Sequence, residues 1–226
     1  GMPAGNENLV NLLYTDYATE YLTVDKEGIT ETLKNVQTEK PDIVIALVHW
    51  GSEYNEDISS TQKSIVSLMK KNGVFVAHCP ESNENIKSGI APIRKYMEKG
   101  INVGMGSDIA GGTTEAIFDA IVDAVKVSKL YWRLVDDTVE PLSFSDAFYL
   151  ATKGGGAFFG KVGSFEKGYD GDLLILSDDE IPFPRYLTPT ERLERFAYLH
   201  GDKLGIKGKW VKGERILYSF VKTNHY

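Results

Sequence analysis

The sequence has few of the features that mark secreted, membrane-bound or nucleic-acid-binding proteins. Its 226 residues include a single cysteine, Cys79, which excludes an intramolecular disulfide and favours a reducing compartment. No apolar run approaches the ~20 residues that a membrane-spanning helix needs. The formal net charge is −7 and no basic run is present, which argues against nucleic acid as a partner. We therefore expect a cytoplasmic chain that binds neither nucleic acid nor membrane.

What the sequence does contain is an alternation of short apolar runs and helix-like segments. Val74–Ala77 and Ile101–Met105 are two such runs, and between them lies a helical segment, Ile90–Lys99, that Gly100 closes. An earlier run, Asp42–Val48, is continuously β-rich, as a strand buried on both faces requires. Parallel strands joined by helices form α/β sheets, which hold ligands at the carboxyl ends of their strands. The sequence therefore predicts an α/β fold.

Chemically useful side chains follow all three of these runs. His49 follows the run Asp42–Val48, and His78 and Cys79 follow the run Val74–Ala77. Asp108 comes shortly after the run Ile101–Met105. If the runs are adjacent parallel strands, these side chains share one edge of the sheet. A buried histidine and a helix-capping aspartate in any α/β protein would produce the same pattern. The residues alone leave both interpretations open.

The last third of the chain carries a glycine-rich helix and a small β region. Ser143–Phe159 has helical character but is interrupted by Gly154–Gly156. This triplet lacks the Lys and Ser/Thr of a phosphate-binding P-loop, so we interpret it as a site of tight helix packing. Asp172–Leu176 and Lys209–Tyr218 read as strands, and the second is a predicted hairpin that turns at Lys212-Gly213.

Several stretches carry recognisable motifs. They read HCPESN at His78–Asn83, SGIAPIRKY at Ser88–Tyr96, INVGMGSDIAGG at Ile101–Gly112 and AFYLATKGGGAFFGKVGSFEKG at Ala147–Gly168. Over roughly residues 64–217 the chain thereby resembles the C-terminal half of guanine deaminases, which are metal-dependent amidohydrolases with (β/α)8 barrels. The resemblance implies a partial TIM barrel of about four βα units, half of the whole, in residues 1–165. A small β appendage with one helix is expected in residues 166–226.

The resemblance also implies a reaction and a site. Guanine deaminases convert guanine and water to xanthine and ammonia, with zinc as the usual metal of the family. By this resemblance Asp108 ends the eighth barrel strand and acts beside the metal, and His49 stands where a second metal-binding residue is expected. His78 would shape the substrate pocket, while Ser82 and Asn83 would contact the purine edge. A polar loop that caps the next helix is an equally good interpretation of Glu81–Asn85.

The four histidines limit how much of this function is expected. They are His49, His78, His200 and His225, and no HxH pair is among them, although the family binds its metal with one. The N-terminal half of the barrel is expected to be missing, so we predict an impaired enzyme or, alternatively, a non-catalytic remnant with at most a weak metal or ligand site. Half a barrel exposes sheet edges and part of its inner layer, which predicts a homo-oligomer.

Residues of about 10–73 have a second, weaker resemblance. The motif HWGSEY at His49–Tyr54 is similar to one in the poly-γ-glutamate/capsule synthesis family of metallophosphoesterase-like proteins. Metallophosphoesterase chemistry is therefore a third alternative. With this resemblance the chain reads as a join of two families, with a seam near residues 64–73. A natural fusion, a degraded gene and an artificial chimera would all give the same sequence pattern at this seam.

Overall fold

The structure is a computed structural model that describes residues 75–182, 185–199 and 205–216, together with residues 30, 31, 34, 35, 38, 67 and 70. The chain divides into two compact units, Gly1–Val74 and Phe75–Tyr226. The strand predicted at Asp42–Val48, the histidine that follows it and all but two residues of the proposed family seam lie outside the described residues. The domain boundary expected at residue 165 stays a prediction.

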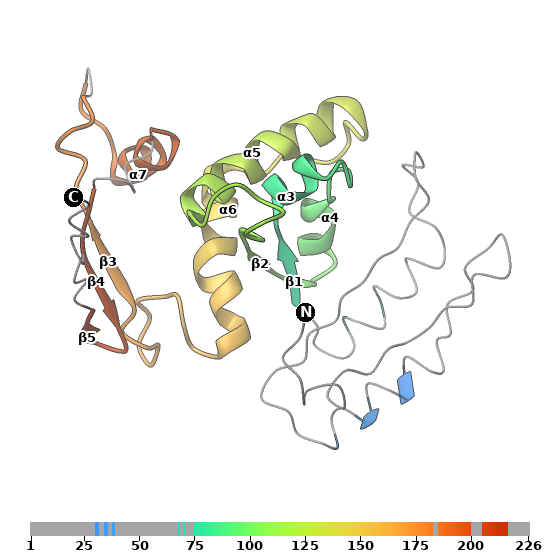
Figure 1. Ribbon diagram of the computed structural model, residues 1–226, viewed down its shortest axis with the longest axis horizontal. Coiled ribbons are helices and arrows are strands. Elements are labelled where there is room, and N and C mark those ends of the chain that lie inside the picture. Colours follow the sequence, from blue (N-terminus) through green and yellow to red (C-terminus); the bar gives the residue numbers. More distant parts are fainter. Residues whose placement is uncertain are drawn as a thin grey trace, which may run out of the picture. The chain divides into compact units, whose positions relative to one another are not determined.

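The second unit begins with the predicted βα unit (Figure 1). Strands β1 (Phe75–His78) and β2 (Asn102–Met105) pair in parallel, with Phe75 opposite Asn102 and His78 opposite Met105. Helices α3 (Pro80–Asn85) and α4 (Ile93–Glu98) form the connection between the strands. The predicted adjacency of these two strands is therefore confirmed, with bounds that differ by one residue. Gly100 ends the connection with a φ of +66°, a conformation that glycine adopts without a steric penalty.

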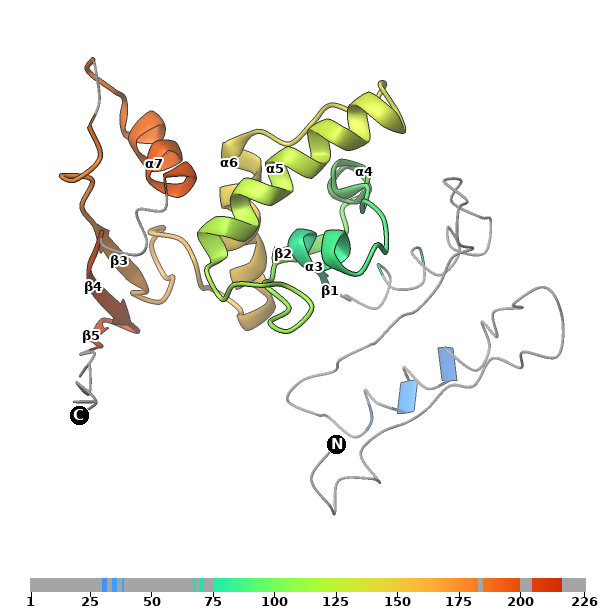
Figure 2. The ribbon, with the colours of Figure 1, turned by 45° about the horizontal axis from the view of Figure 1, so that its top comes forward.

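Helix α5 (Ile117–Leu134) is the longest helix among the described residues, and its apolar face forms the centre of the core. It contacts α3, β2, α6 and α7, and Figures 1 and 2 show α6 crossing it at an angle. Its buried side chains recur at helical spacing, which is why this segment folds as an amphipathic helix. They are Ala120, Ile121, Val122, Ala124, Val125, Val127 and Tyr131.

Helix α6 (Phe144–Tyr149) begins with a capping box, in which the side chains of Ser143 and Asp146 each bond the other residue's backbone N–H. It continues into a π-helical turn, Leu150–Gly154. A Cβ atom on Gly104 of β2 would lie 2.9 Å from the Cα of Gly155, so the strand and the helix approach each other too closely for a side chain. The glycine triplet therefore packs against β2, as predicted.

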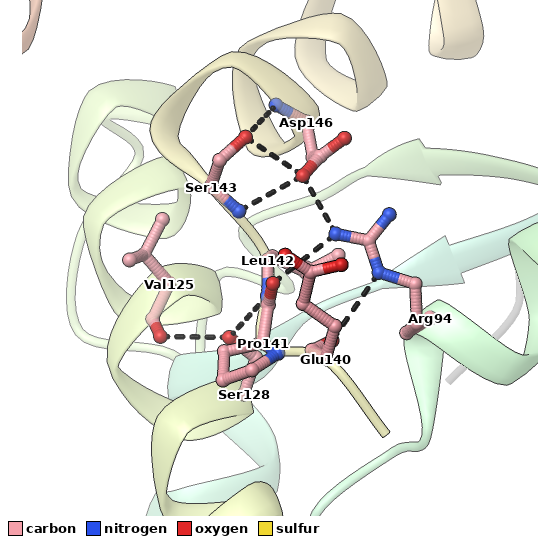
Figure 3. A network of polar contacts seen from close by, with 8 residues as sticks. All are labelled: Arg94, Val125, Ser128, Glu140, Pro141, Leu142, Ser143 and Asp146. Carbon is pink, nitrogen blue, oxygen red and sulfur yellow. Dashed lines mark hydrogen bonds and ion pairs between the residues drawn. The ribbon is translucent and has the colours of Figure 1, made fainter. Parts of the chain in front are cut away.

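Charged side chains of α4 bond to α6 and to the segment between α5 and α6 (Figure 3). The guanidinium of Arg94 donates to Asp146 at 2.7 Å, to the carbonyl of Pro141 at 3.1 Å and to the carbonyl of Glu140 at 3.2 Å. The next residue, Lys95, donates to Asp136 at 2.6 Å, and this bond is the main cause that lowers the pKa of Asp136 to about 2. These bonds fix the helix that precedes β2.

The C-terminal part contains the predicted small sheet. Strands β3 (Leu173–Leu176), β4 (Ile206–Val211) and β5 (Glu214–Arg215) are antiparallel in the order β3-β4-β5. The hairpin turns at Lys212 and Gly213, whose φ values of +51° and +80° are those of the turn that suits a two-residue hairpin. Helix α7 (Pro189–Tyr198) packs against α5 through an edge-on ring contact between Phe196 and Phe118.

The architecture is thus mixed α/β, with one parallel strand pair in the described residues and a separate antiparallel sheet. The half-barrel of about four βα units stays a prediction. Across the described ranges, no helix is both long and apolar enough to cross a membrane.

Candidate functional site

The loop that follows β2 holds Asp108 in an unusual backbone conformation. Its φ is +47°, in the left-handed region that aspartate tolerates better than most residues. The carbonyl of Asp108 accepts hydrogen bonds from the N–H groups of Gly111, at 2.9 Å, and Gly112, at 2.6 Å. This tight loop places an exposed carboxylate just beyond the carboxyl end of the strand.

The HCPESN motif runs from the end of β1 into the start of α3, and this helix start reaches the carboxylate. Pro80 occupies the first turn of α3, where a proline has no N–H bond to lose. Ser82 is 4% exposed, and its hydroxyl donates to Oδ2 of Asp108 at 2.5 Å. Such a length is typical of an O–H···O⁻ bond that a charge strengthens. The bond joins the two motifs that follow β1 and β2, although 26 positions separate them in sequence.

Two further bonds connect the same helix and loop. The side-chain amide of Asn85 donates to the carbonyl of Gly111 at 2.9 Å, and the hydroxyl of Thr113 donates to Glu81. A Cβ on Gly111 would lie 2.5 Å from the hydroxyl oxygen of Ser82 and 2.6 Å from Oδ2 of Asp108. Only glycine fits there without displacing one of these groups. Helix α3 and the Asp108 loop therefore form one interlocked structure.

His78, the last residue of β1, is buried and 3% exposed. Neither of its ring nitrogens has a hydrogen-bond partner within the part of the chain that the structure describes. Burial lowers the pKa of His78 to about 4, so the imidazole is neutral at pH 7. Strand alternation puts its side chain on the opposite face of the sheet from that of Ala77.

Cys79 lies on the Ala77 side of the strand pair. A Cβ on Gly106 would meet both the sulfur of Cys79, at 2.8 Å, and the Cβ of Ala77, at 3.9 Å. Burial raises the pKa of the Cys79 thiol, and the negative charge of Asp108 adds to the effect. The thiol is therefore protonated at neutral pH.

Asn83 makes local bonds within its own turn. The side-chain amide of Asn83 donates to the hydroxyl of Ser88 at 2.8 Å. The backbone carbonyl of Asn83 accepts a hydrogen bond from the backbone N–H of Ser88 at 3.0 Å. The interpretation of this segment as a polar loop is wrong, because residues 80–85 form α3. Pro80 and Glu81 are signals of a helix start that the sequence did carry.

The described residues do not by themselves fit a zinc centre. A catalytic zinc site needs about three protein ligands. No group of three or more His, Cys, Asp or Glu side chains that suits a metal ion occurs in residues 75–182, 185–199 and 205–216 or at the few described positions before them. His78, Cys79 and Asp108 lie at or just beyond the carboxyl ends of the adjacent strands β1 and β2, yet they do not form such a group. The predicted metal-site residue His49 lies outside the described residues.

The sequence pattern of the Amidohydrolase family matches residues 22–215. A guanine deaminase of Dictyostelium discoideum is 33% identical over 158 residues, which are 67% of this chain and 35% of that protein. Among solved structures, guanine deaminase from C. acetobutylicum with bound guanine in the active site has 47% identity and a TM-score of 0.65, over 70% of this chain and 37% of that one.

An adenosine deaminase from Xanthomonas campestris, whose structure contains bound zinc, has 24% identity and a TM-score of 0.54, over 69% of this chain and 34% of that one. At this identity the likeness shows the fold alone, which is the TIM-barrel-like amidohydrolase fold. The chain thus spans about a third of the length of each of these proteins.

These matches correct two interpretations of the N-terminal region. The family pattern begins at residue 22, well before the start near residue 64 that the motifs indicated. It also runs through the HWGSEY motif and the expected seam, and none of the reported likenesses supports a metallophosphoesterase. Since the match covers most of the sequence and includes the interlocked helix α3 and Asp108 loop, the chain belongs to the amidohydrolase family.

Proposed function

We propose that this chain is an amidohydrolase of the guanine deaminase type, which converts guanine and water to xanthine and ammonia. The observation that carries the proposal is the bond from Ser82 to Asp108, because it links the two motifs through which the chain resembles these enzymes. The relatives and solved structures named guanine deaminase support the substrate class.

Asp108 is the residue proposed to move the proton. The oxygen of water forms the new bond to the purine carbon that bears the amino group, and the C–N bond of that carbon then breaks. Asp108 takes a proton from the water and passes it to the departing ammonia. Its carboxylate suits this role because the residue is exposed and one oxygen, Oδ2, is already held by Ser82.

The remaining site residues are proposed to bind the purine or a metal ion. His78 has two ring nitrogens without partners in the described part of the chain, which supports a hydrogen bond to a ligand. Asn83 is proposed as a purine contact, in exchange for its bond to Ser88. Zinc is the proposed cofactor, with Asp108 and His49 as its ligands. The proton transfer described above requires only Asp108 from this chain.

A second candidate function is a non-catalytic protein with a weak ligand site. It is favoured by the lack of a three-ligand metal group among the described residues and by the absence of an HxH pair from the sequence. For the same reasons we expect slow turnover even if the chain is an enzyme.

The two candidates are separated by incubating the purified chain with guanine, with and without added zinc. Guanine loss is followed by ultraviolet absorbance, and ammonia by a coupled assay. The proposed function expects xanthine and ammonia in equal amounts, whereas the non-catalytic candidate expects neither product under either condition.

A further inference from the structure

The hydroxyl of Ser82 is already committed within the protein. A serine hydroxyl has one proton to donate, and here that proton goes to Oδ2 of Asp108 at 2.5 Å. Ser82 is 4% exposed, so its oxygen lies behind the surface that a ligand would meet, whereas Asp108 is exposed. A bond donated from Ser82 to a purine would require this bond to break, and a bond accepted from a purine would still require the buried side chain to turn outward.

The surroundings hold the two groups in this arrangement. Asn85, from the same helix, bonds the carbonyl of Gly111, and the absence of a side chain at Gly111 leaves just enough room for both oxygens. Oδ1 of Asp108 makes no hydrogen bond among the described residues. The bond at Oδ2 therefore restricts rotation of the carboxylate and leaves Oδ1 for the transferred proton.

We infer that Ser82 is a positioning residue for Asp108, which acts through this carboxylate and does not contact the purine. The inference rests on the proposed function, because it assigns Ser82 a part in the proton transfer of Asp108. It replaces the expectation, drawn from the sequence, that Ser82 binds the purine edge.

The two roles predict different kinetics for Ser82→Ala. Loss of a purine contact raises KM, whereas a misplaced proton acceptor lowers kcat and leaves KM unchanged. Groups that orient a functional side chain typically cost about 10- to 100-fold in activity when removed, and we expect a fall of that size in kcat. Ser82→Thr retains a hydroxyl and should recover most of the lost kcat.

Ser143→Ala is the matched control, since it removes the same kind of bond at a distant place. The hydroxyl of Ser143 donates to Oδ2 of Asp146 at 2.7 Å, at the start of α6. The kcat and KM of Ser143→Ala should match those of the wild type. That result would show that the loss of a Ser–Asp bond elsewhere in the protein does not lower kcat. A Ser82→Ala variant with wild-type kcat, or with a raised KM alone, would overturn the inference.

A double-mutant cycle tests the inference without turnover. The unfolding constants of wild type, Ser82→Ala, Asp108→Ala and the double variant are measured in urea, and we expect a coupling of about fivefold or more. If the wild type releases no xanthine, the proposed function fails, and the cycle then tests only whether Ser82 holds the carboxylate of Asp108. Coupling below about twofold then overturns the positioning role. Ser82→Cys replaces Ser82→Ala in the cycle if the alanine variant does not fold.

Discussion

Lowering the pH from 7 to 5 should weaken the fold through His78. Its side chain is buried without a hydrogen-bond partner among the described residues, and burial lowers its pKa from 6.5 to about 4. The unfolded chain therefore binds a proton at this residue near pH 6.5, whereas the folded chain binds one only near pH 4. Unfolding takes up a proton between these values, so acid favours the unfolded state. The contribution to stability is complete above pH 6.5 and is lost as the pH falls toward 4.

The size of the loss follows from the shift. A difference of roughly 2.5 pH units corresponds to about 3 kcal/mol once the pH is below both pKa values, and to about 2 kcal/mol between pH 7 and pH 5. Asp136 and Glu191 also have shifted pKa values, both lowered to about 2. The contributions of these carboxylates decline only at lower pH, because their usual pKa values are 3.8 and 4.5. They do not obscure the window from pH 7 to 5.

The assay is urea unfolding of the wild type and of His78→Leu at pH 7, 6 and 5. Leucine fills a similar volume, has no nitrogen to leave unpaired, and does not titrate. The other three histidines are common to both proteins, so the difference between the proteins isolates His78. The wild type should lose about 2 kcal/mol more stability than the variant. Equal losses in both proteins would refute the argument that a buried, neutral imidazole occupies this position.

Three further predictions follow from particular contacts. Gly111→Ala should displace Ser82 or Asp108, because its Cβ would lie 2.5 Å from the hydroxyl oxygen of Ser82 and 2.6 Å from Oδ2 of Asp108. It should lower the stability in urea by about 1–3 kcal/mol and abolish any guanine turnover, so a variant with unchanged stability and turnover would contradict the geometry. Arg94→Ala should cost about 2 kcal/mol in urea unfolding, since it removes partly buried charged bonds. Lys153→Ala breaks an exposed ion pair and should cost clearly less in the same assay, so equal losses would contradict this difference. Light scattering at micromolar concentration should give a dimer or a larger species, because parallel sheets are almost always buried on both faces. A monodisperse monomer would show that the chain buries the β1–β2 sheet by itself.

The sequence predicted the parts of the fold that depend on local pattern. Apolar runs and a closing glycine were enough to find β1, α4 and β2, because strand and helix periods leave their mark on neighbouring residues. The Lys212-Gly213 turn was found for the same reason, since a two-residue hairpin demands that kind of residue pair. The predicted helix begins at Ile90, three residues before the observed start of α4 at Ile93. Pro92 accounts for the difference, because a proline disfavours the helical conformation of the residue before it.

The arrangement of the candidate site could not be read in the same way. The bond between Ser82 and Asp108 spans 26 positions and depends on how α3 meets the β2 loop, which no local pattern encodes. The helix that begins at Pro80 within the HCPESN motif does have a local signal, because proline at the first position and Glu81 in the first turn both favour a helix start. The position of His49 stays a prediction.

The most direct test of the proposed function is the rate at which guanine is deaminated by the wild type, by Asp108→Asn and by Asp137→Asn. The asparagine at position 108 keeps the shape of the side chain but removes the proton acceptor, and should lower kcat by about 10²- to 10⁴-fold. Asp137, an exposed aspartate after α5, is a matched control for the loss of one negative charge. The account predicts xanthine formation by the wild type and by Asp137→Asn, with little or none by Asp108→Asn. Equal rates in all three proteins, or no xanthine from any of them, would contradict it.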